Sequence, residues 1–509
     1  MARYKDRSRT QGMMMPIRLE DQLVPGTFEY TVDYLVDNEI DLSVFESRYA
    51  NDEVGAPAYD PAVLLKVVLC GYARGMTSSR GIARACEENI IFMALSADSR
   101  PHFTTIAEFV SSMSEQIESV FTDVLTVCYT EGLIGKKMFA IDGCKISSNC
   151  SKEWSGTKAE LRKKAEKLER SVSMVLDTHR KRDASESEPG QKEREEKAIL
   201  NLKAKAAKVR EFLATNEERI GTQGKPVKSN VTDKESAKMP SSHGVIQGYN
   251  GIATVDDEHQ VIVDAQAFGD GHEAKHVGEV IDSVDKRMRK LDAGLNIYKE
   301  AVITADTGFH SEASVRTMLD RGIDAYIADT HFRRRDPRFA EQQMYKAKTT
   351  DKRRTSKKRM YFTASEFTQK PDGSLYCPAG KKMNWRTKRY ADQNRGYEGR
   401  SYRADPKDCA VCELRSRCIR GKKATARTVN IIDRATTAIE RMIERFDTER
   451  GRHYYSRRMG TVEPVFANIR HNHGLDWFSL RGRVKVDTQW KLFCMVHNIG
   501  KIAAKRRTG

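Results

Sequence analysis

The chain has 509 residues, which suggests about three domains, and no run of 18 apolar residues predicts a transmembrane helix. Its 88 lysines and arginines outnumber its 71 aspartates and glutamates, giving a net charge of +17. This basic excess favours a polyanionic partner such as nucleic acid, although an ordinary basic protein has the same composition; we expect a cytoplasmic protein without a membrane partner.

Residues 1–135 are predicted to form a helical domain. Pro61 suits the first turn of one helix, Ser78 or Ser79 can cap the next, and Thr105–Glu108 has the spacing of a capping box that opens another. Short helices in succession are typical of a helix-turn-helix unit that binds DNA. They are equally typical of a helical bundle used for dimerisation.

A change of pattern follows, and residues 136–156 are predicted to contribute the first part of a sheet. Met138–Ile146 is expected to be a strand, with Asp142 at the end of its apolar run. Lysine, glutamate, arginine and alanine dominate residues 157–224, and Ser185–Gly190 breaks this segment, which predicts a helical hairpin. Its charges most simply form a solvated surface, although its lysines could contact DNA.

Residues 225–330 are predicted to form the second part of the sheet. The apolar stretches Val245–Val255 and Val261–Ala265, joined by a polar turn, predict two hairpin strands. A helix is expected from Glu273 to about Lys290, and a further strand then ends at Asp306. Three early strands followed by alternating helix and strand indicate a mixed sheet with helices on its faces.

The predicted fold class is therefore α/β (α+β mixed): an RNase H-like sheet with a helical N-terminal domain and two insertions. Residues 331–430 form the second insertion, which is strongly basic, and residues 431–509 return to the core as helices that include Glu463. Asp270–Glu273 and His276 could bind a metal ion, but they more simply form a loop and the start of a helix.

Three acidic residues stand in settings that suggest metal-dependent chemistry. Asp142 and Asp306 each end an apolar strand, at the edge of a sheet where ligands bind, whereas Glu463 has helical spacing. Two divalent cations roughly 3.5–4 Å apart can activate an oxygen nucleophile and relieve charge at phosphorus. We interpret Asp142 as bridging two Mg²⁺ ions, Asp306 as binding one and Glu463 as binding the other, with Mn²⁺ as a substitute. A lone strand-end aspartate is usually a turn residue, so this interpretation depends on the combination.

Basic and aromatic residues surround Glu463 in the sequence. Arg470 lies seven positions further on, which places both residues on one helix face, and it could hold a DNA phosphate. Pro464 disfavours helical geometry at Glu463, so we expect a helix to start or kink there. Tyr455 and Arg458 could also reach the DNA backbone. Alternatively, the group is a surface cluster of ion pairs.

Four of the ten cysteines are grouped within the basic insertion. Cys409, Cys412 and Cys418 lie close together, and Cys377 precedes them by a long spacing. Ten cysteines are too sparse for a disulfide scaffold, and four thiolates could form a closed tetrahedral Zn²⁺ site. Such a site would stabilise an insertion with little core of its own. Free thiols remain the alternative.

Several short segments in chain order follow one known pattern: Tyr59–Pro61, Ser78–Ile82, Thr104–Phe109, Ile141–Gly143, Gln247–Asn250, Ala305–Phe309 and Val462–Phe466. They resemble the N-terminal domain, the catalytic segments and one further block of bacterial insertion-sequence transposases of the DDE class. Where relatives carry Tyr, Arg, Glu and Lys, this chain has Tyr455, Arg458, Glu463 and Arg470, with slightly altered spacing.

This resemblance implies an enzyme that cleaves double-stranded DNA at terminal inverted repeats and joins it directly to target DNA. It implies two Mg²⁺ ions, a homodimer or larger synaptic complex, and a place in the bacterial nucleoid. The residues expected to bind DNA are Tyr455, Arg458, Arg470, Arg80, Arg84, Lys381 and Lys382. Two alternatives stay open: a metal-dependent DNA nuclease that does not transpose, and an inactive DNA-binding protein of the same fold.

Overall fold

The structure is a computed structural model, and it divides into two compact units. Unit 1 lies within residues 1–309, 320–327 and 452–509, and unit 2 lies within residues 310–319 and 328–451. Positions 185–188 of the predicted hairpin break lie outside the described residues. The residues that the structure describes are 18–49, 57–182, 189–221, 224–241, 244–292, 294, 296–339, 361–362, 364–392, 397–419, 421, 424–432 and 438–508.

Short helices make up the beginning of unit 1, as predicted. They are η1 Glu20–Gln22, α1 Phe28–Asn38, η2 Ser43–Arg48, α2 Pro61–Ala73, α3 Ser79–Glu88, α4 Ile90–Leu95, α5 Phe103–Ser112 and α6 Ser114–Thr130. Ser78 caps α3 by accepting the N–H of Gly81 at 3.1 Å. The predicted start of α5 at Thr105 is wrong, because the helix begins two residues earlier, where the ring of His102 accepts the N–H of Thr104.

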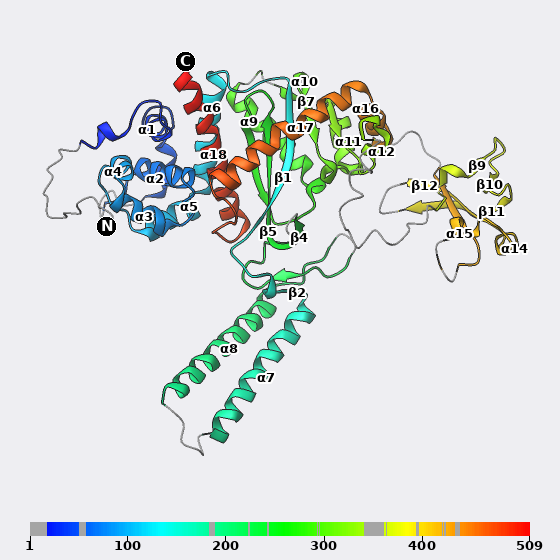
Figure 1. Ribbon diagram of the computed structural model, residues 1–509, viewed down its shortest axis with the longest axis horizontal. Helices are drawn as coiled ribbons and strands as arrows, with labels where there is room; N and C mark the ends of the chain where they lie inside the picture. Colours follow the sequence, from blue (N-terminus) through cyan, green and yellow to red (C-terminus); the bar gives the residue numbers. More distant parts are fainter. Residues whose placement is uncertain are drawn as a thin grey trace, which may run out of the picture. The chain divides into compact units, whose positions relative to one another are not determined.

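A six-stranded mixed sheet forms the centre of unit 1 (Figure 1). Its strands are β1 Met138–Ser147, β4 Ala237–Ser241, β5 Gly244–Asp256, β6 Ile262–Phe268, β7 Val302–Ala305 and β8 Ala325–Ile327. The order is β6-β5-β1-β7-β8, with β4 also paired to β5. Strand β5 is antiparallel to both β1 and β6, whereas β7 is parallel to β1 and to β8. The predicted RNase H-like α/β class is confirmed. The strands β6, β1, β7 and β8 all end at one edge.

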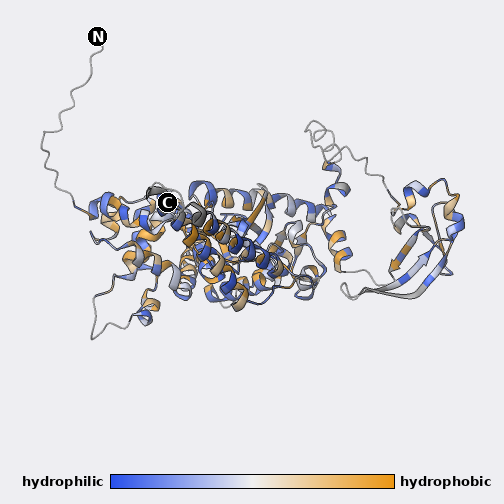
Figure 2. Cartoon of the chain, turned by 90° about the horizontal axis from the view of Figure 1, so that it is seen from below, coloured by the Kyte–Doolittle hydropathy of each residue, from blue (hydrophilic) through white to orange (hydrophobic). Residues whose placement is uncertain are grey.

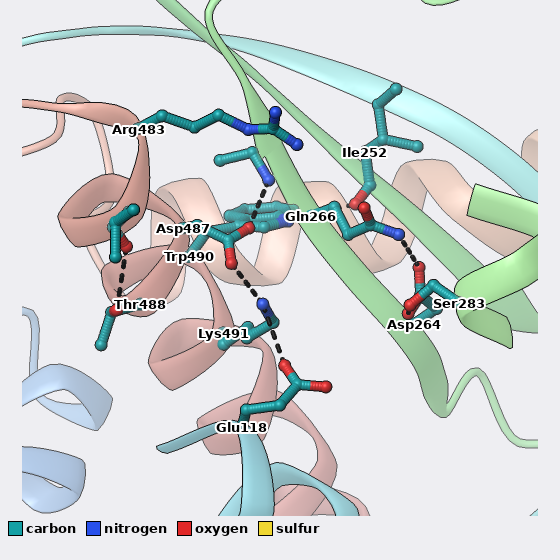
Figure 3. Close-up of polar contacts among 12 residues, drawn as sticks. Glu118, Ile252, Asp264, Gln266, Ser283, Arg483, Asp487, Thr488, Trp490 and Lys491 are labelled. Carbon is teal, nitrogen blue, oxygen red and sulfur yellow. Dashed lines mark hydrogen bonds and ion pairs between the residues drawn. The ribbon is translucent and has the colours of Figure 1, made fainter. Parts of the chain in front are cut away.

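Helices pack against this sheet: α9 Val277–Leu291, α10 Ile297–Glu300, α17 Glu449–Ala467 and α18 Arg483–Thr508. The indole of Trp490 in α18 donates to the carbonyl of Ile252 at 3.2 Å. The next residue, Lys491, contacts the carboxylates of both Asp487 and Glu118, so it ties α18 to α6 (Figure 3). Polar contacts thus fix the orientation of a helix whose central residues are almost all buried.

The predicted helical hairpin consists of α7 Lys158–Arg182 and α8 Pro189–Thr215 (Figure 1). Its base has a small apolar cluster of its own, and short strands β2 Ser155–Gly156 and β3 Ser229–Asn230 pair beside it. Further along, Arg210 forms a two-pronged ion pair with Glu169. The apolar contacts of the hairpin therefore gather where it joins the sheet. Figure 2 shows polar and apolar residues alternating along the helices of the structure.

Unit 2 contains a five-stranded antiparallel sheet in the order β13-β12-β11-β10-β9, which the sequence did not predict. Its strands are β9 Thr368–Gln369, β10 Leu375–Tyr376, β11 Lys382–Asp392, β12 Tyr397–Arg403 and β13 Thr428–Ile432. Its helices include α12 Phe332–Arg335, α14 Pro406–Ala410, α15 Arg415–Cys418 and α16 Ala438–Phe446. In the described part of both units, no helix has the length and apolar character needed to cross a bilayer.

Candidate active site

Asp142 and Asp306 lie beside each other at the edge of the sheet in unit 1. The last parallel pair between β1 and β7 is Ile141 with Ala305, so the aspartates are the next residue on each of two neighbouring strands. Strand β7 ends there, whereas β1 continues to Ser147 alongside β5. Asp142 therefore stands within a strand, at the point where one neighbour ends and a ligand gains access.

The two aspartates are held by short hydrogen bonds. Asp142 Oδ2 accepts from Arg458 Nη1 at 2.6 Å, and Asp142 Oδ1 accepts from the N–H of Gly143 at 2.8 Å. Asp306 Oδ1 accepts from the N–H of Gly308, also at 2.8 Å. Burial raises the pKa of Asp142 above its usual value; Arg458 opposes this rise, and the charge of Asp306 adds to it.

A third carboxylate, that of Glu273, lies beside Gly143 and Gly308, the glycines that follow the two aspartates. Glu273 begins the short 3-10 helix η4, Glu273–Lys275, which follows β6, and only 7% of its surface is exposed. Asn250 Nδ2 on β5 donates to Glu273 Oε1 at 3.2 Å, and Lys145 Nζ on β1 lies 3.6 Å from the same oxygen. Burial and the charge of Asp306 raise the pKa of Glu273 to about 7, although Lys145 opposes the rise.

Two glycines make the space that this carboxylate occupies. A Cβ atom at Gly308 would overlap Oε2 of Glu273 and lie 3.0 Å from Oδ1 of Asp306. A Cβ atom at Gly143 would lie 2.8 Å from both Oε1 of Glu273 and Oδ1 of Asn250. Gly143 directly follows Asp142, and Gly308 lies two positions after Asp306. Glycine at these two positions therefore leaves the room that the Glu273 carboxylate needs to reach the site.

The donor set of this site consists of oxygen atoms. Asn250 is fully buried, and its Oδ1 has no hydrogen-bond donor among the described residues. Carboxylate and amide oxygens suit hard cations such as Mg²⁺ and Mn²⁺. Within the described residues, no three His, Cys, Asp or Glu side chains are already arranged to hold an ion. The side chains would therefore have to adjust as a cation binds.

Glu463 lies on α17 and is exposed. It follows Arg458 by five positions, a rise of roughly 7.5 Å along a helix, and Arg458 reaches Asp142. Further on, Arg470 in the π-helical turn η9, Asn468–Asn472, bonds to the thiol of Cys144 on β1. Glu463 thus stands between two arginines that both contact β1, and its role as the third catalytic carboxylate stays a prediction.

The expected helix start at Pro464 is wrong, because α17 begins at Glu449 and contains Pro464 in its interior. Proline lacks an N–H group, which leaves the carbonyl four residues earlier, that of Gly460, without its helical partner. Gln260 Nε2, next to β6, donates to that carbonyl at 3.0 Å. A side chain outside the helix therefore replaces the missing bond and anchors α17 near the sheet.

The other residues predicted to bind DNA are placed as follows. The side chain of Tyr455 is half-buried, and the Arg458 guanidinium lies 5.5 Å from its ring; Arg458 itself is buried. Arg80 and Arg84 are exposed, and their spacing of four positions puts them on one face of α3. In unit 2, Lys381 and Lys382 are exposed at the start of β11, and the four grouped cysteines line a cavity of about 30 Å³. The predicted functions of all these residues stay predictions.

Sequence reasoning named Asp270–Glu273 as a segment that could bind metal but preferred a loop and the start of a helix, and it did not connect Glu273 with Asp142 and Asp306. The loop and helix start were expected, and the structure confirms them. The direction of β6 could not be predicted from the local sequence. Because β6 runs parallel to β1 and β7, the residues after it reach the same edge of the sheet as Asp142 and Asp306. Gly143 and Gly308 were the local sign in the sequence that another side chain packs beside the aspartates.

Two family models match parts of this chain. Residues 376–503 match a model described as a transposase DDE domain, and this match includes Glu463. Residues 17–112 match a model described as a transposase domain (DUF772), and this match includes α1 to α5. No curated protein matches the chain.

Proposed function

We propose that Asp142, Asp306 and Glu463 are the catalytic carboxylates of this chain, which is an insertion-sequence transposase of the DDE class, an enzyme that cleaves DNA and transfers the cut strand. DNA is its substrate, and domains of this class use divalent metal ions. The net charge of +17 suits a polyanionic substrate. The identity of the metal ions, the roles of individual residues and the oligomeric state are proposals.

The juxtaposition of Asp142 and Asp306 is the observation that carries this assignment. Backbone pairing fixes the two residues on adjacent parallel strands, and each has one oxygen held by a local N–H group. Both carboxylates are therefore oriented before substrate arrives, as efficient catalysis requires. Glu463 completes the set because α17 also supplies Arg458, which contacts Asp142.

We assign two Mg²⁺ ions to this site, with Mn²⁺ able to replace them, held by Asp142, Asp306 and Glu463. When bound, the ions supply an activated oxygen nucleophile and charge neutralisation at phosphorus. Arg458 holds one oxygen of Asp142, so we expect it to position that carboxylate rather than to grip a phosphate. Tyr455 packs against Arg458 and limits where its guanidinium can lie.

DNA contact is assigned to the half-buried Arg470 and to exposed basic residues further from this buried group. Arg470 follows Glu463 by seven positions and suits a phosphate near the cleaved bond. Arg80 and Arg84 present two charges on one face of α3, and Lys381 and Lys382 do so on unit 2. These residues would bind terminal repeats. Because two transposon ends must meet, the active form is proposed to be a homodimer or a larger synaptic complex.

A strand-transfer assay tests the proposal. The protein is supplied with pre-cleaved repeat ends, a plasmid target and Mg²⁺, and joined products are separated from nicked plasmid on a gel. Asp142→Asn, Asp306→Asn and Glu463→Gln should each abolish joining while DNA binding, measured by fluorescence anisotropy, stays at the parent level.

Glu449→Gln is the matched control for Glu463, because Glu449 is also an exposed glutamate of α17. It should join DNA like the parent. Full activity of Glu463→Gln would remove this residue from the catalytic set. Nicking without any joined product by the parent protein would contradict strand transfer.

A further inference from the structure

Cys377 and the closely spaced Cys409, Cys412 and Cys418 come together in unit 2. Cys377 follows β10, Cys409 lies in α14, Cys412 follows that helix, and Cys418 ends α15. All four line the same cavity of about 30 Å³, and all four are free thiols. A cavity of this size is comparable to the volume of one water molecule in the liquid, so it suits a single small ion.

Backbone hydrogen bonds fix two of these cysteines. The N–H of Gly380 donates to the carbonyl of Cys377 at 2.8 Å, and the N–H of Arg415 donates to the carbonyl of Cys412 at 3.0 Å. Cys377 and Cys412 thus each occupy the first position of a tight turn. The carbonyl of each cysteine accepts the hydrogen bond that closes the turn. Gly380 has a φ of +73°, a conformation that glycine adopts without strain. The main chain around both thiols is already ordered for ligation.

The charge around the cavity suits an anionic metal–thiolate group. Lys381, Arg415 and Arg427 line the cavity together with Asp408 and the cysteines. Four thiolates and one Zn²⁺ carry a net charge of −2, which the excess of two positive charges on these residues would offset. Arg415 also donates to the carbonyl of Cys409 at 2.8 Å, so its guanidinium is held beside the group.

The apolar cluster that includes Cys418 is small. Among the residues that the structure describes, it comprises eight buried residues. Cores this small usually need a disulfide or a metal ion as an additional constraint. From the shared cavity, the ordered turns and the surrounding cations, we propose that Cys377, Cys409, Cys412 and Cys418 bind one structural Zn²⁺.

The thiols are expected to draw together when the ion binds. Tetrahedral zinc sites hold sulfur at about 2.3 Å, and in the described part of the chain no such group is already closed around an ion position. Rotation of the four side chains within one cavity can supply this movement without a change in the two turns. The proposal therefore predicts a site that is closed and ordered only with metal.

Metal analysis of the full-length protein tests this proposal. The parent protein should contain one zinc per chain, and titration of the metal-free protein with Co²⁺ should produce the thiolate-to-metal charge-transfer absorption of a tetrahedral sulfur site. Cys412→Ser and Cys418→Ser should lose both signals. Cys412→His, which keeps a zinc ligand, should retain bound metal.

Cys150→Ser is the matched control, since Cys150 is a half-buried free cysteine of unit 1. It should retain zinc and the Co²⁺ spectrum. The Co²⁺ titration uses the parent sequence, so a poorly folded variant cannot decide the outcome. A parent protein that binds neither Zn²⁺ nor Co²⁺ through sulfur would overturn the proposal and leave four free thiols.

A second observation, independent of the cysteines, concerns Glu273 and rests on the function proposed above. Its carboxylate occupies space that Gly143 and Gly308 leave open, immediately beside both aspartates. The fully buried Oδ1 of Asn250 lies at the same place without a donor among the described residues, while Nδ2 of the same side chain holds Glu273. We propose that Glu273 is a further ligand of the divalent ions and that Asn250 positions it.

Mn²⁺ binding by the protein without DNA tests the role of Glu273, with free Mn²⁺ measured by electron paramagnetic resonance. Glu273→Gln keeps the shape of the side chain but loses its charge, and it should weaken Mn²⁺ binding by about 10–100-fold. Glu279→Gln is the control, because Glu279 is a half-exposed glutamate of α9. It should bind Mn²⁺ like the parent.

The outcomes separate this inference from the proposed function. If Asp142→Asn and Asp306→Asn lose Mn²⁺ while Glu273→Gln binds it normally, Glu273 is not a ligand and the aspartate site still stands. If all three variants bind Mn²⁺ normally, the proposed metal site is wrong as well. Weakened binding in all three supports both.

Discussion

The acidic site of unit 1 and the cysteine cavity of unit 2 represent two ways of building a metal site. In unit 1 the aspartates stand in or directly after strands of a sheet, and large side chains of the core, such as Phe139 of β1 and Trp490 of α18, are fully buried. In unit 2 the thiols stand on turns and short helices around a cluster of eight buried residues. The acidic site is positioned by the core of unit 1, which exists without metal. The cysteine site is itself part of the core of unit 2.

Because of this difference, loss of metal should have opposite consequences in the two units. Loss of cations from the acidic site should remove activity and leave the fold intact, because β1 and β7 are held by their own hydrogen bonds. Loss of zinc from the cysteine cavity should remove folded structure, because few apolar contacts remain there.

The largest effect is expected from a pair of substitutions, Asp306→Asn and Cys418→Ser. Asp306→Asn should lower the rate of strand transfer by about 10³-fold or more, since a metal-ligating carboxylate is worth several kcal/mol in the transition state. Its resistance to limited proteolysis should match the parent. Cys418→Ser should instead expose unit 2 to proteolysis, as followed by mass spectrometry of the fragments. If Asp306→Asn also becomes protease-sensitive, the contrast fails.

A smaller loss of activity is expected from Gly308→Ala. The added methyl group overlaps Oε2 of Glu273, so the carboxylate must move away from Asp306. Displacement of a catalytic group by about 1 Å can lower the rate by roughly 10²-fold. The measurement is the strand-transfer rate at saturating Mg²⁺.

Gly460→Ala provides the control for this substitution. Gly460 lies within α17, and no atom would lie within 4 Å of a Cβ there. Replacing an interior helical glycine by alanine should stabilise unit 1 by about 0.5–1 kcal/mol without changing the rate. Equal rates for Gly308→Ala and the parent would show that the position of Glu273 does not matter.

The smallest effect concerns pH and the packing of unit 1. His497 in α18 donates from Nε2 to the carbonyl of Gln260 at 2.8 Å, and Nδ1 then accepts from Asn468. Burial lowers its pKa to about 4. The unfolded chain, with a pKa near 6.5, binds the proton more tightly, so the stabilising effect is complete above about pH 6.5 and is lost as pH falls toward 4.

Between pH 6.5 and 5 this group should therefore remove about 2 kcal/mol of the free energy of unfolding of unit 1. Urea unfolding followed by tryptophan fluorescence measures the change, and His497→Gln should show a flatter dependence on pH. His453→Gln, at an exposed position of α17, should keep the slope of the parent. A His497→Gln variant whose stability depends on pH in the same way as that of the parent would contradict the assigned tautomer and burial.

Sequence patterns were informative where structure is local and strongly buried. Apolar stretches gave β1, β5, β6 and β7, and the order of strands and helices gave the fold class. The same patterns located Asp142 and Asp306, because each directly follows such a stretch. Contacts between residues that are far apart in the sequence could not be predicted from such stretches.

Three features show where local patterns failed. Glu273 reaches the aspartates only because β6 is parallel to β1, which no short segment of sequence states. Pro464 is tolerated within α17 because Gln260, about 200 positions earlier, bonds to the carbonyl of Gly460. The sheet of unit 2 consists partly of two-residue strands and has charged residues along β11, so its periodicity is weak.

The position of α18 in the sequence has a consequence for how the protein is made on the ribosome. This helix covers β5 and β6, yet most of unit 2 is translated between β8 and α18. At roughly 5–20 residues per second, the apolar surface of the sheet stays uncovered for on the order of ten seconds while that segment is synthesised. The nascent chain can complete unit 2 before unit 1, so DNA cleavage cannot begin until well after most of the polypeptide has emerged.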